Sequence, residues 1–143
     1  PLVLKGMSSI KKFKIVKPVY PQIRVDFSIF YPSPLDVVTN LLGEEPKKCK
    51  QTYMIPDPLY FWYMVTKQSY CLSLEEKFDK MISMLGRRVT MLQQLVKDYE
   101  LDVGFKGVVV MKNVEAPVIG LSKERIALLT SLNADFEVII YRS

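Results

Sequence analysis

The chain has 143 residues, of which 49% are hydrophobic and 24% charged, as is typical of one folded domain with a sizeable core. No apolar run approaches the roughly 20 residues of a membrane-spanning helix, which excludes a span within this sequence. Six of the 20 basic residues precede Asp26, the first acidic one, and the remaining chain carries 14 basic and 15 acidic residues. We therefore expect a basic N-terminal arm or edge strand over residues 1–22 and a single domain over residues 23–143.

The first residues and the cysteines bear on the cellular compartment. Residues 1–6 lack signal-peptide architecture, and Met7 followed by two serines is typical of a natural start, so we interpret the preceding residues as a remnant of cloning. Cys49 and Cys71 are 22 positions apart, a spacing that matches neither redox nor zinc motifs. These features favour a cytoplasmic protein with two buried or inert thiols.

In chain order, the hydrophobic patterns predict a short edge strand, four further strands, and four helices between the strands. The strands are expected over residues 10–16 (the edge strand), 23–30, 59–66, 102–111 and 136–141. The helices are expected over residues 34–42, 74–85, 88–99 and 123–132. Apolar and largely polar residues alternate along residues 23–30, which indicates a strand that covers a core on one face only. Residues 59–66 are nearly all apolar, which is typical of a central strand.

The most regular pattern lies between Ser73 and Glu100, where apolar residues recur at three- and four-residue spacing and predict one buried helical stripe. Ser73 and Glu76 have the spacing of a capping box. A straight helix of about 27 residues would run roughly 40 Å, which exceeds the width of a domain this small. Because Gly86 lies in its middle, we predict two helices joined at Gly86-Arg87.

The alternation of strands and helices normally indicates a parallel sheet covered on both faces. The polar side chains of residues 24–28, and of Asp135 and Glu137, argue against it, since doubly covered strands are apolar throughout. We therefore expect an α+β fold. It should be a two-layer sandwich with a mainly antiparallel or mixed sheet of four to five strands and the helices on one face.

Three segments resemble a family known as domain of unknown function 4279. They are the helix ending in Leu41-Leu42-Gly43-Glu44-Glu45-Pro46, the strand that places Trp62 before the helix pair, and the tail Gly120–Asp135. The resemblance spans about residues 24–141, and the loop before Trp62 departs from it with Pro56-Asp57-Pro58 in place of a glycine-containing turn. It implies a small, stand-alone, mostly bacterial protein without an assigned reaction, and an immunity or antagonist role beside a toxin would suit such a protein.

The sequence contains no constellation typical of an enzyme. Histidine is absent, which removes Ser–His and Cys–His nucleophile pairs and the commonest zinc ligand. The fragment Gly104-Phe105-Lys106-Gly107 is too short for a phosphate-binding loop, and the pair Glu75-Glu76 is explained by helix capping and the helix dipole. We therefore expect a non-enzymatic protein with no cofactor and no bound metal.

Two groups of residues are candidates for binding a partner. The aromatic group comprises Tyr53, Tyr60 and Tyr63, and the basic group comprises Arg87, Arg88, Lys47 and Lys48. Large aromatic residues and arginine dominate binding hot spots, although aromatics dominate cores as well. The leading hypothesis is a protein-binding module, for example an immunity-type inhibitor of a toxin or enzyme.

Two other functions stay open, and the position of Trp62 distinguishes a structural role of the aromatic strand from a binding role. The lysine arm at Lys11, Lys12 and Lys14 suits nucleic-acid binding, and a pocket near Trp62 and the 44–58 loop would suit a small molecule. Trp62 itself is expected to face the helices beside Met81, Leu85 or Leu92, with its indole N–H hydrogen-bonded. Neither a membrane partner nor a particular oligomeric state is indicated.

Overall fold

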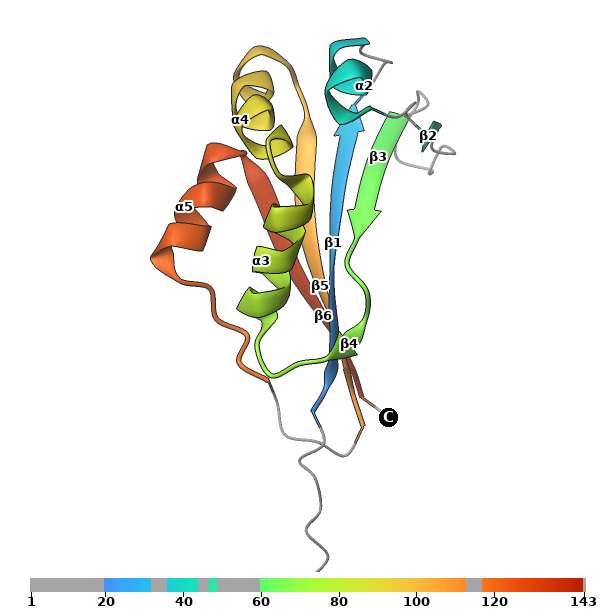
Figure 1. Cartoon of the computed structure of the whole chain (residues 1–143), viewed down its shortest axis with the longest axis vertical. Helices are drawn as coiled ribbons and strands as arrows, with labels where there is room; N and C mark the ends of the chain where they lie inside the picture. The colour runs from blue at the N-terminus through green and yellow to red at the C-terminus, as the bar shows by residue number, and fades with distance from the viewer. Residues whose placement is uncertain (1–19, 32–35, 44–46, 49–59, 113–116, 143) are drawn as a thin grey trace, which may run out of the picture.

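The computed structural model describes residues 20–31, 36–43, 47–48, 60–112 and 117–142. They form one mixed sheet with the helices on one face, the predicted α+β arrangement (Figure 1). The strands are β1 (Gln22–Tyr31), β2 (Lys47–Lys48), β3 (Tyr60–Val65), β4 (Ser69–Tyr70), β5 (Asp102–Met111) and β6 (Ala134–Arg142). The helices are α2 (Asp36–Leu42), α3 (Leu74–Leu85), α4 (Arg88–Asp98) and α5 (Lys123–Ser131).

Strand β1 lies at the centre of the sheet, whose order is β2-β3-β1-β5-β6, with the short β4 paired to the start of β1. It runs antiparallel to β3, β4 and β5, whereas β6 runs parallel to β5. The run at residues 59–66 is interior to the sheet, because β3 pairs with both β1 and β2, but the interpretation of it as a strand covered on both faces is wrong. Tyr63 and Val65 of β3 are 43% and 47% exposed, so this aromatic run covers the core with one face only.

The core lies between the sheet and the four helices. Alternate side chains of β1 (Ile23, Val25, Phe27, Ile29 and Tyr31) are fully buried, and the intervening ones are half-buried, as the alternation in the sequence predicts. Phe27 contacts Phe105 of β5, with ring centroids 5.0 Å apart, and Phe105 contacts Phe78 of α3. Gly107 lets α3 lie close to β5, because a Cβ atom there would come within 2.7 Å of Leu74 Cδ1.

The predicted helix pair is confirmed, with α3 ending at Leu85, Gly86 in a positive-φ conformation (φ 56°), and α4 beginning at Arg88. The predicted capping box is wrong. Ser73 occupies the N-cap position of α3, but its side chain makes no capping hydrogen bond. The carboxylate of Glu76 instead accepts a hydrogen bond from the Cys71 thiol, a tertiary contact that competes with the local one.

Trp62 faces the helices, as predicted, and is 3% exposed. It belongs to the same buried cluster as Met81, Leu85 and Leu92. The expected hydrogen bond of its indole N–H is wrong, since Nε1 has no acceptor among the described residues. The Arg88 guanidinium lies over the ring, 5.8 Å from its centroid, and can only donate hydrogen bonds.

Several predictions lie outside the described residues: the edge strand at 10–16, the first residues of the helix expected at 34–42, Cys49, and most of the loop at 44–58. Within that loop, Lys47 and Lys48 form β2, which pairs with β3. In the part of the chain that the structure describes, no helix is long and apolar enough to cross a membrane.

Candidate functional site

The face of the sheet turned away from the helices, here called the open face, carries a group of aromatic side chains. The β1–β3 register places Phe30 opposite Phe61, Ser28 opposite Tyr63 and Asp26 opposite Val65. Opposed residues of an antiparallel pair point to the same face. Phe30, Phe61, Tyr63 and Val65 therefore lie together on the open face, and we call these four residues the aromatic patch.

Stacking orders the rings of the aromatic patch. The centroids of Phe30 and Phe61 are 5.8 Å apart with an interplanar angle of 26°, and those of Phe61 and Tyr63 are 5.7 Å apart at 19°. Phe30 and Phe61 are half-buried, whereas Tyr63 and Val65 are exposed. The patch thus presents preordered apolar surface to solvent, a feature enriched at protein–protein contacts.

The start of β1 presents a different surface on the same face. Arg24 Nε donates to Asp26 Oδ1 at 3.1 Å, and Arg24 Nη1 donates to Gln68 Oε1 at 3.2 Å. Gln68 Nε2 in turn donates to Gln22 Oε1 at 3.1 Å. These polar side chains satisfy one another, so the start of β1 presents a polar surface beside the aromatic patch.

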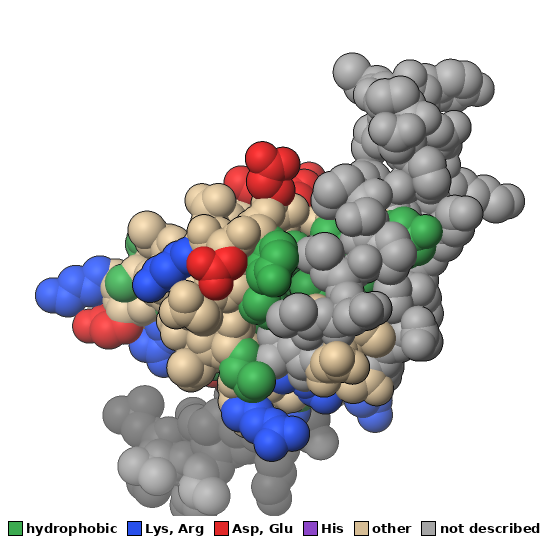
Figure 2. Space-filling view, turned by 90° about the horizontal axis from the view of Figure 1, so that it is seen from above, with side chains coloured by type: hydrophobic (Ala, Val, Ile, Leu, Met, Phe, Trp, Pro, Cys, Tyr) green, Lys and Arg blue, Asp and Glu red, His purple; other side chains and the backbone are tan. Residues whose placement is uncertain are grey.

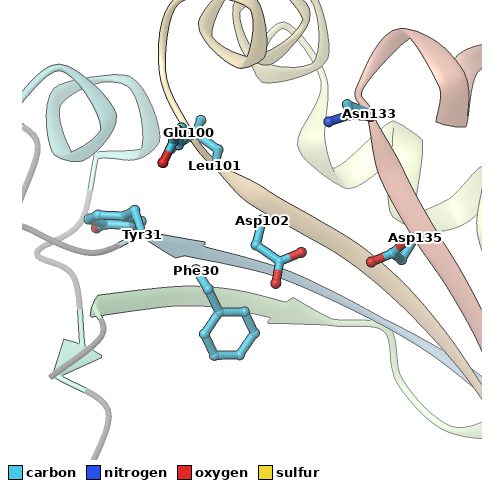
Figure 3. A pocket seen from close by; sticks show the side chains of 7 residues that line it. All are labelled: Phe30, Tyr31, Glu100, Leu101, Asp102, Asn133 and Asp135. Atoms are coloured by element: carbon cyan, nitrogen blue, oxygen red, sulfur yellow. The ribbon is translucent and has the colours of Figure 1, made fainter. Parts of the chain in front are cut away.

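A cavity of about 570 Å³ opens at the end of the sheet beside Phe30. Its lining consists of Phe30, Tyr31, Glu100, Leu101, Asp102, Asn133 and Asp135 (Figure 3). Asp102 lies opposite Phe30 in the β1–β5 register, and Asp135 lies beside Gly104 in the β5–β6 register. Figure 2 looks onto this end of the molecule and shows acidic side chains exposed next to hydrophobic ones.

The cavity is acidic. None of the carboxylates of Glu100, Asp102 and Asp135 forms an ion pair with another described residue. The described residues contain no group of three His, Cys, Asp or Glu side chains that could hold a metal ion. Uncompensated carboxylates of this kind favour cationic groups and repel phosphates.

A second cavity, of about 440 Å³, includes Cys71, Glu76 and Lys77 in its lining. The Cys71 thiol lies 3.1 Å from Glu76 Oε2 and 3.2 Å from the carbonyl oxygen of Ser73. Burial raises the pKa of this thiol, and the neighbouring Glu76 carboxylate raises it further. The thiol therefore stays protonated at neutral pH and is a poor nucleophile, in agreement with the inert cysteine that the sequence predicts.

The predicted binding residues do not form one surface. Tyr63 belongs to the aromatic patch, whereas Tyr60 stacks on Tyr31, with centroids 6.2 Å apart, on the side of the helices. The basic residues lie elsewhere: Arg88 over Trp62, Arg87 exposed at the α3–α4 junction, and Lys47 and Lys48 in β2. Tyr53 lies outside the described residues.

Sequence reasoning missed most of the aromatic patch. Phe30 stands in the polar half of the β1 alternation, after Arg24, Asp26 and Ser28. An aromatic residue at a position where alternation predicts exposure was the available signal. Phe61 and Val65 carried no such signal, because the whole run at 59–66 is rich in aromatic and apolar residues.

Comparison with known proteins gives one result. Neither the curated proteins nor the solved structures include a match to this chain. The family described as domain of unknown function (DUF4279) matches residues 21–143, nearly the whole chain and the region of the resemblance noted above. The chain belongs to the DUF4279 family of domains of unknown function.

Proposed function

We propose that this protein is a non-enzymatic protein-binding module and that the aromatic patch is its contact surface. The observation that supports it is the stack of Phe30, Phe61 and Tyr63, extended by Val65, on a sheet face that no described helix covers. Aromatic side chains are enriched among residues that contribute most to binding. The patch also lies beside an acidic cavity, which offers polar contacts at its rim.

The order of the patch matters for affinity. Binding loses free energy when flexible side chains become fixed, at about 0.5–1.5 kcal/mol for each rotamer-rich side chain. Stacked rings on a regular strand pair are already held in place, so they lose little freedom when a partner covers them. Removing their apolar surface from water contributes roughly 25 cal/mol per Å².

The charges favour a protein over a nucleic acid. The carboxylates of Glu100, Asp102 and Asp135 lie at one end of the patch and would repel phosphate groups. Arg24, the basic residue of β1 on this face, is already paired with Asp26. The nucleic-acid alternative rests on Lys11, Lys12 and Lys14, outside the described residues, and it predicts oligonucleotide binding that weakens steeply with salt.

A small-molecule site beneath the aromatic strand has less support. Trp62 is buried, and neither of the two cavities described above includes it in its lining. An immunity-type inhibitor is the form of protein binding that we propose to test first, because blocking a partner requires a complementary surface and no catalytic residues. A toxin gene beside the gene for this protein would support that form.

Site-specific photocrosslinking tests the contact surface. A photoreactive phenylalanine derivative replaces Tyr63 in the patch or, as a matched control, Tyr99 after α4, which is 39% exposed. The full chain is expressed in cells of its source and irradiated. We expect a protein adduct of one defined mass from position 63 and none of that mass from position 99.

Two results would contradict the proposal. Equal adducts from positions 63 and 99 would indicate random collision with abundant proteins. An adduct at position 63 that nuclease treatment removes, and protease treatment leaves, would assign this face to nucleic acid.

A further inference from the structure

The two edges of the sheet are built differently. At one edge, β2 has two residues, both lysine. Short strands and lysine side chains are common means by which proteins prevent a sheet edge from pairing with another molecule. At the other edge, β6 has nine residues, and no described strand pairs with its outer side.

The outer edge of β6 lacks these protective features along its second half. Val138, Ile139, Ile140 and Tyr141 are four consecutive residues without a charge, a proline or a glycine. The ladder between β5 and β6 is regular from Val103↔Ala134 to Met111↔Arg142, so no bulge turns the edge away. The outer backbone groups of β6 are therefore in the geometry that a further strand requires.

The side chains along this edge are also incompletely covered. On the side of the helices, Val138 is half-buried and Ile140 is 43% exposed, because α5 contributes only Leu129 to the buried core. On the open face, Tyr141 is 55% exposed. A long, regular and apolar edge of this kind favours pairing with another strand.

We propose that β6 pairs antiparallel with β6 of a second copy of this chain, about a two-fold axis at Ile139, to form one continuous sheet. In that register Val138 lies opposite Ile140, Glu137 opposite Tyr141, and Phe136 opposite Arg142 of the other copy. Each pair consists of residues that point to the same face, as antiparallel pairing requires. No like charges are opposed.

The second copy suits this edge because the strand is complementary to itself. Apolar residues meet apolar residues at the centre, and at the ends Arg142 meets the ring of Phe136, a favourable cation–π arrangement. A two-fold interface uses the same surface on both copies, and this is the commonest symmetry of soluble oligomers. The outer ladder also gains main-chain hydrogen bonds between the two copies over residues 136–142.

The first experiment measures the mass of the full chain in solution by analytical ultracentrifugation. We expect twice the 16.5 kDa of one chain, tested from about 1 to about 100 μM, where a dimer of micromolar Kd passes from mostly dissociated to mostly associated. Ile140→Lys places a charge on the edge and should give the monomer. Met91→Lys is the control, since Met91 of α4 is 49% exposed and α4 contacts α2 and α3, whereas α5 packs on β6; this variant should stay dimeric.

A second variant tests the register and does not depend on the folding of Ile140→Lys. In a Cys49→Ser background, Ile139→Cys brings the two introduced thiols opposite each other on the axis, at a Cα separation of about 4.5–5.5 Å that a disulfide can bridge. We expect oxidation to give a disulfide-linked dimer, and Met91→Cys in the same background to give none. A wild-type monomer over the whole concentration range, or a dimer that survives Ile140→Lys without cross-linking at position 139, would overturn the proposal.

Discussion

Replacing Trp62 tests both the core assignment and the unpartnered indole N–H. Trp62 is 3% exposed, and its ring packs edge-on against Phe27 with centroids 5.9 Å apart. Trp62→Ala removes the ring and leaves a cavity, which should lower the free energy of unfolding by about 4 kcal/mol. For a chain of this size, that loss lowers Tm by about 13 °C.

Trp62→Phe separates packing from hydrogen bonding. Phenylalanine keeps most of the ring contacts and leaves a smaller cavity, while it also removes a buried donor that has no acceptor among the described residues. An unsatisfied buried donor costs about 1–3 kcal/mol, so its removal offsets part of the lost packing. We therefore expect Trp62→Phe to change the free energy of unfolding by less than about 1.5 kcal/mol.

Urea denaturation followed by circular dichroism measures both variants, because Trp62 is the only tryptophan and its replacement removes the tryptophan fluorescence. A loss below about 1 kcal/mol for Trp62→Ala would refute the core assignment. Breaking a buried hydrogen bond would add about 1–3 kcal/mol to the loss from packing. A total loss of about 3 kcal/mol or more for Trp62→Phe would therefore mean that the N–H has a partner after all.

Three further predictions follow from the contacts of α3 with its surroundings. Gly107→Ala forces a Cβ atom against the buried Leu74 and should cost about 1–3 kcal/mol in urea denaturation, whereas an unchanged midpoint would mean that Leu74 repacks freely. Cys71 should react with iodoacetamide far more slowly in the native protein than in urea at pH 7, because burial raises the pKa of its thiol, and equal rates would contradict its burial. The backbone N–H of Ser122 donates to the Glu75 carboxylate and lowers its pKa. The stability that this hydrogen bond contributes is present above the ordinary carboxyl pKa and is lost as pH falls through the lowered value. An NMR titration that gives Glu75 the ordinary pKa would exclude the contact.

Elements fixed by local chemistry could be predicted from the sequence. The bounds of α3 and β5 agree with the prediction residue for residue. Helical periodicity and Gly86 define α3, and the apolar run defines β5. Helix α5 ends at Ser131, one residue before the predicted end at residue 132, and Asn133 follows in a positive-φ conformation (φ 48°). The capping box failed because Glu76 has a competing partner, Cys71, that is near only in the folded chain.

The order of the strands could not be predicted in the same way, since it depends on pairing between distant segments. Residues 59–66 read equally well as a central strand and as a strand with one exposed aromatic face. Only the register with β1 shows that Phe61, Tyr63 and Val65 share a face with Phe30. The aromatic patch is therefore a product of tertiary pairing, and single-residue reasoning recovered only Tyr63.

The aromatic patch and the outer edge of β6 lie on the same sheet but depend on different strands. The patch is formed by β1 and β3, and β5 separates both from β6. A two-fold axis through the sheet at Ile139 would turn both open faces to the same side, so a dimer would present two patches to a partner and bind a multivalent partner more tightly than one copy does. Tyr63 and Ile140 can be changed separately, because neither contributes to the buried core. The protein-binding proposal and the dimer proposal can therefore each fail while the other stands.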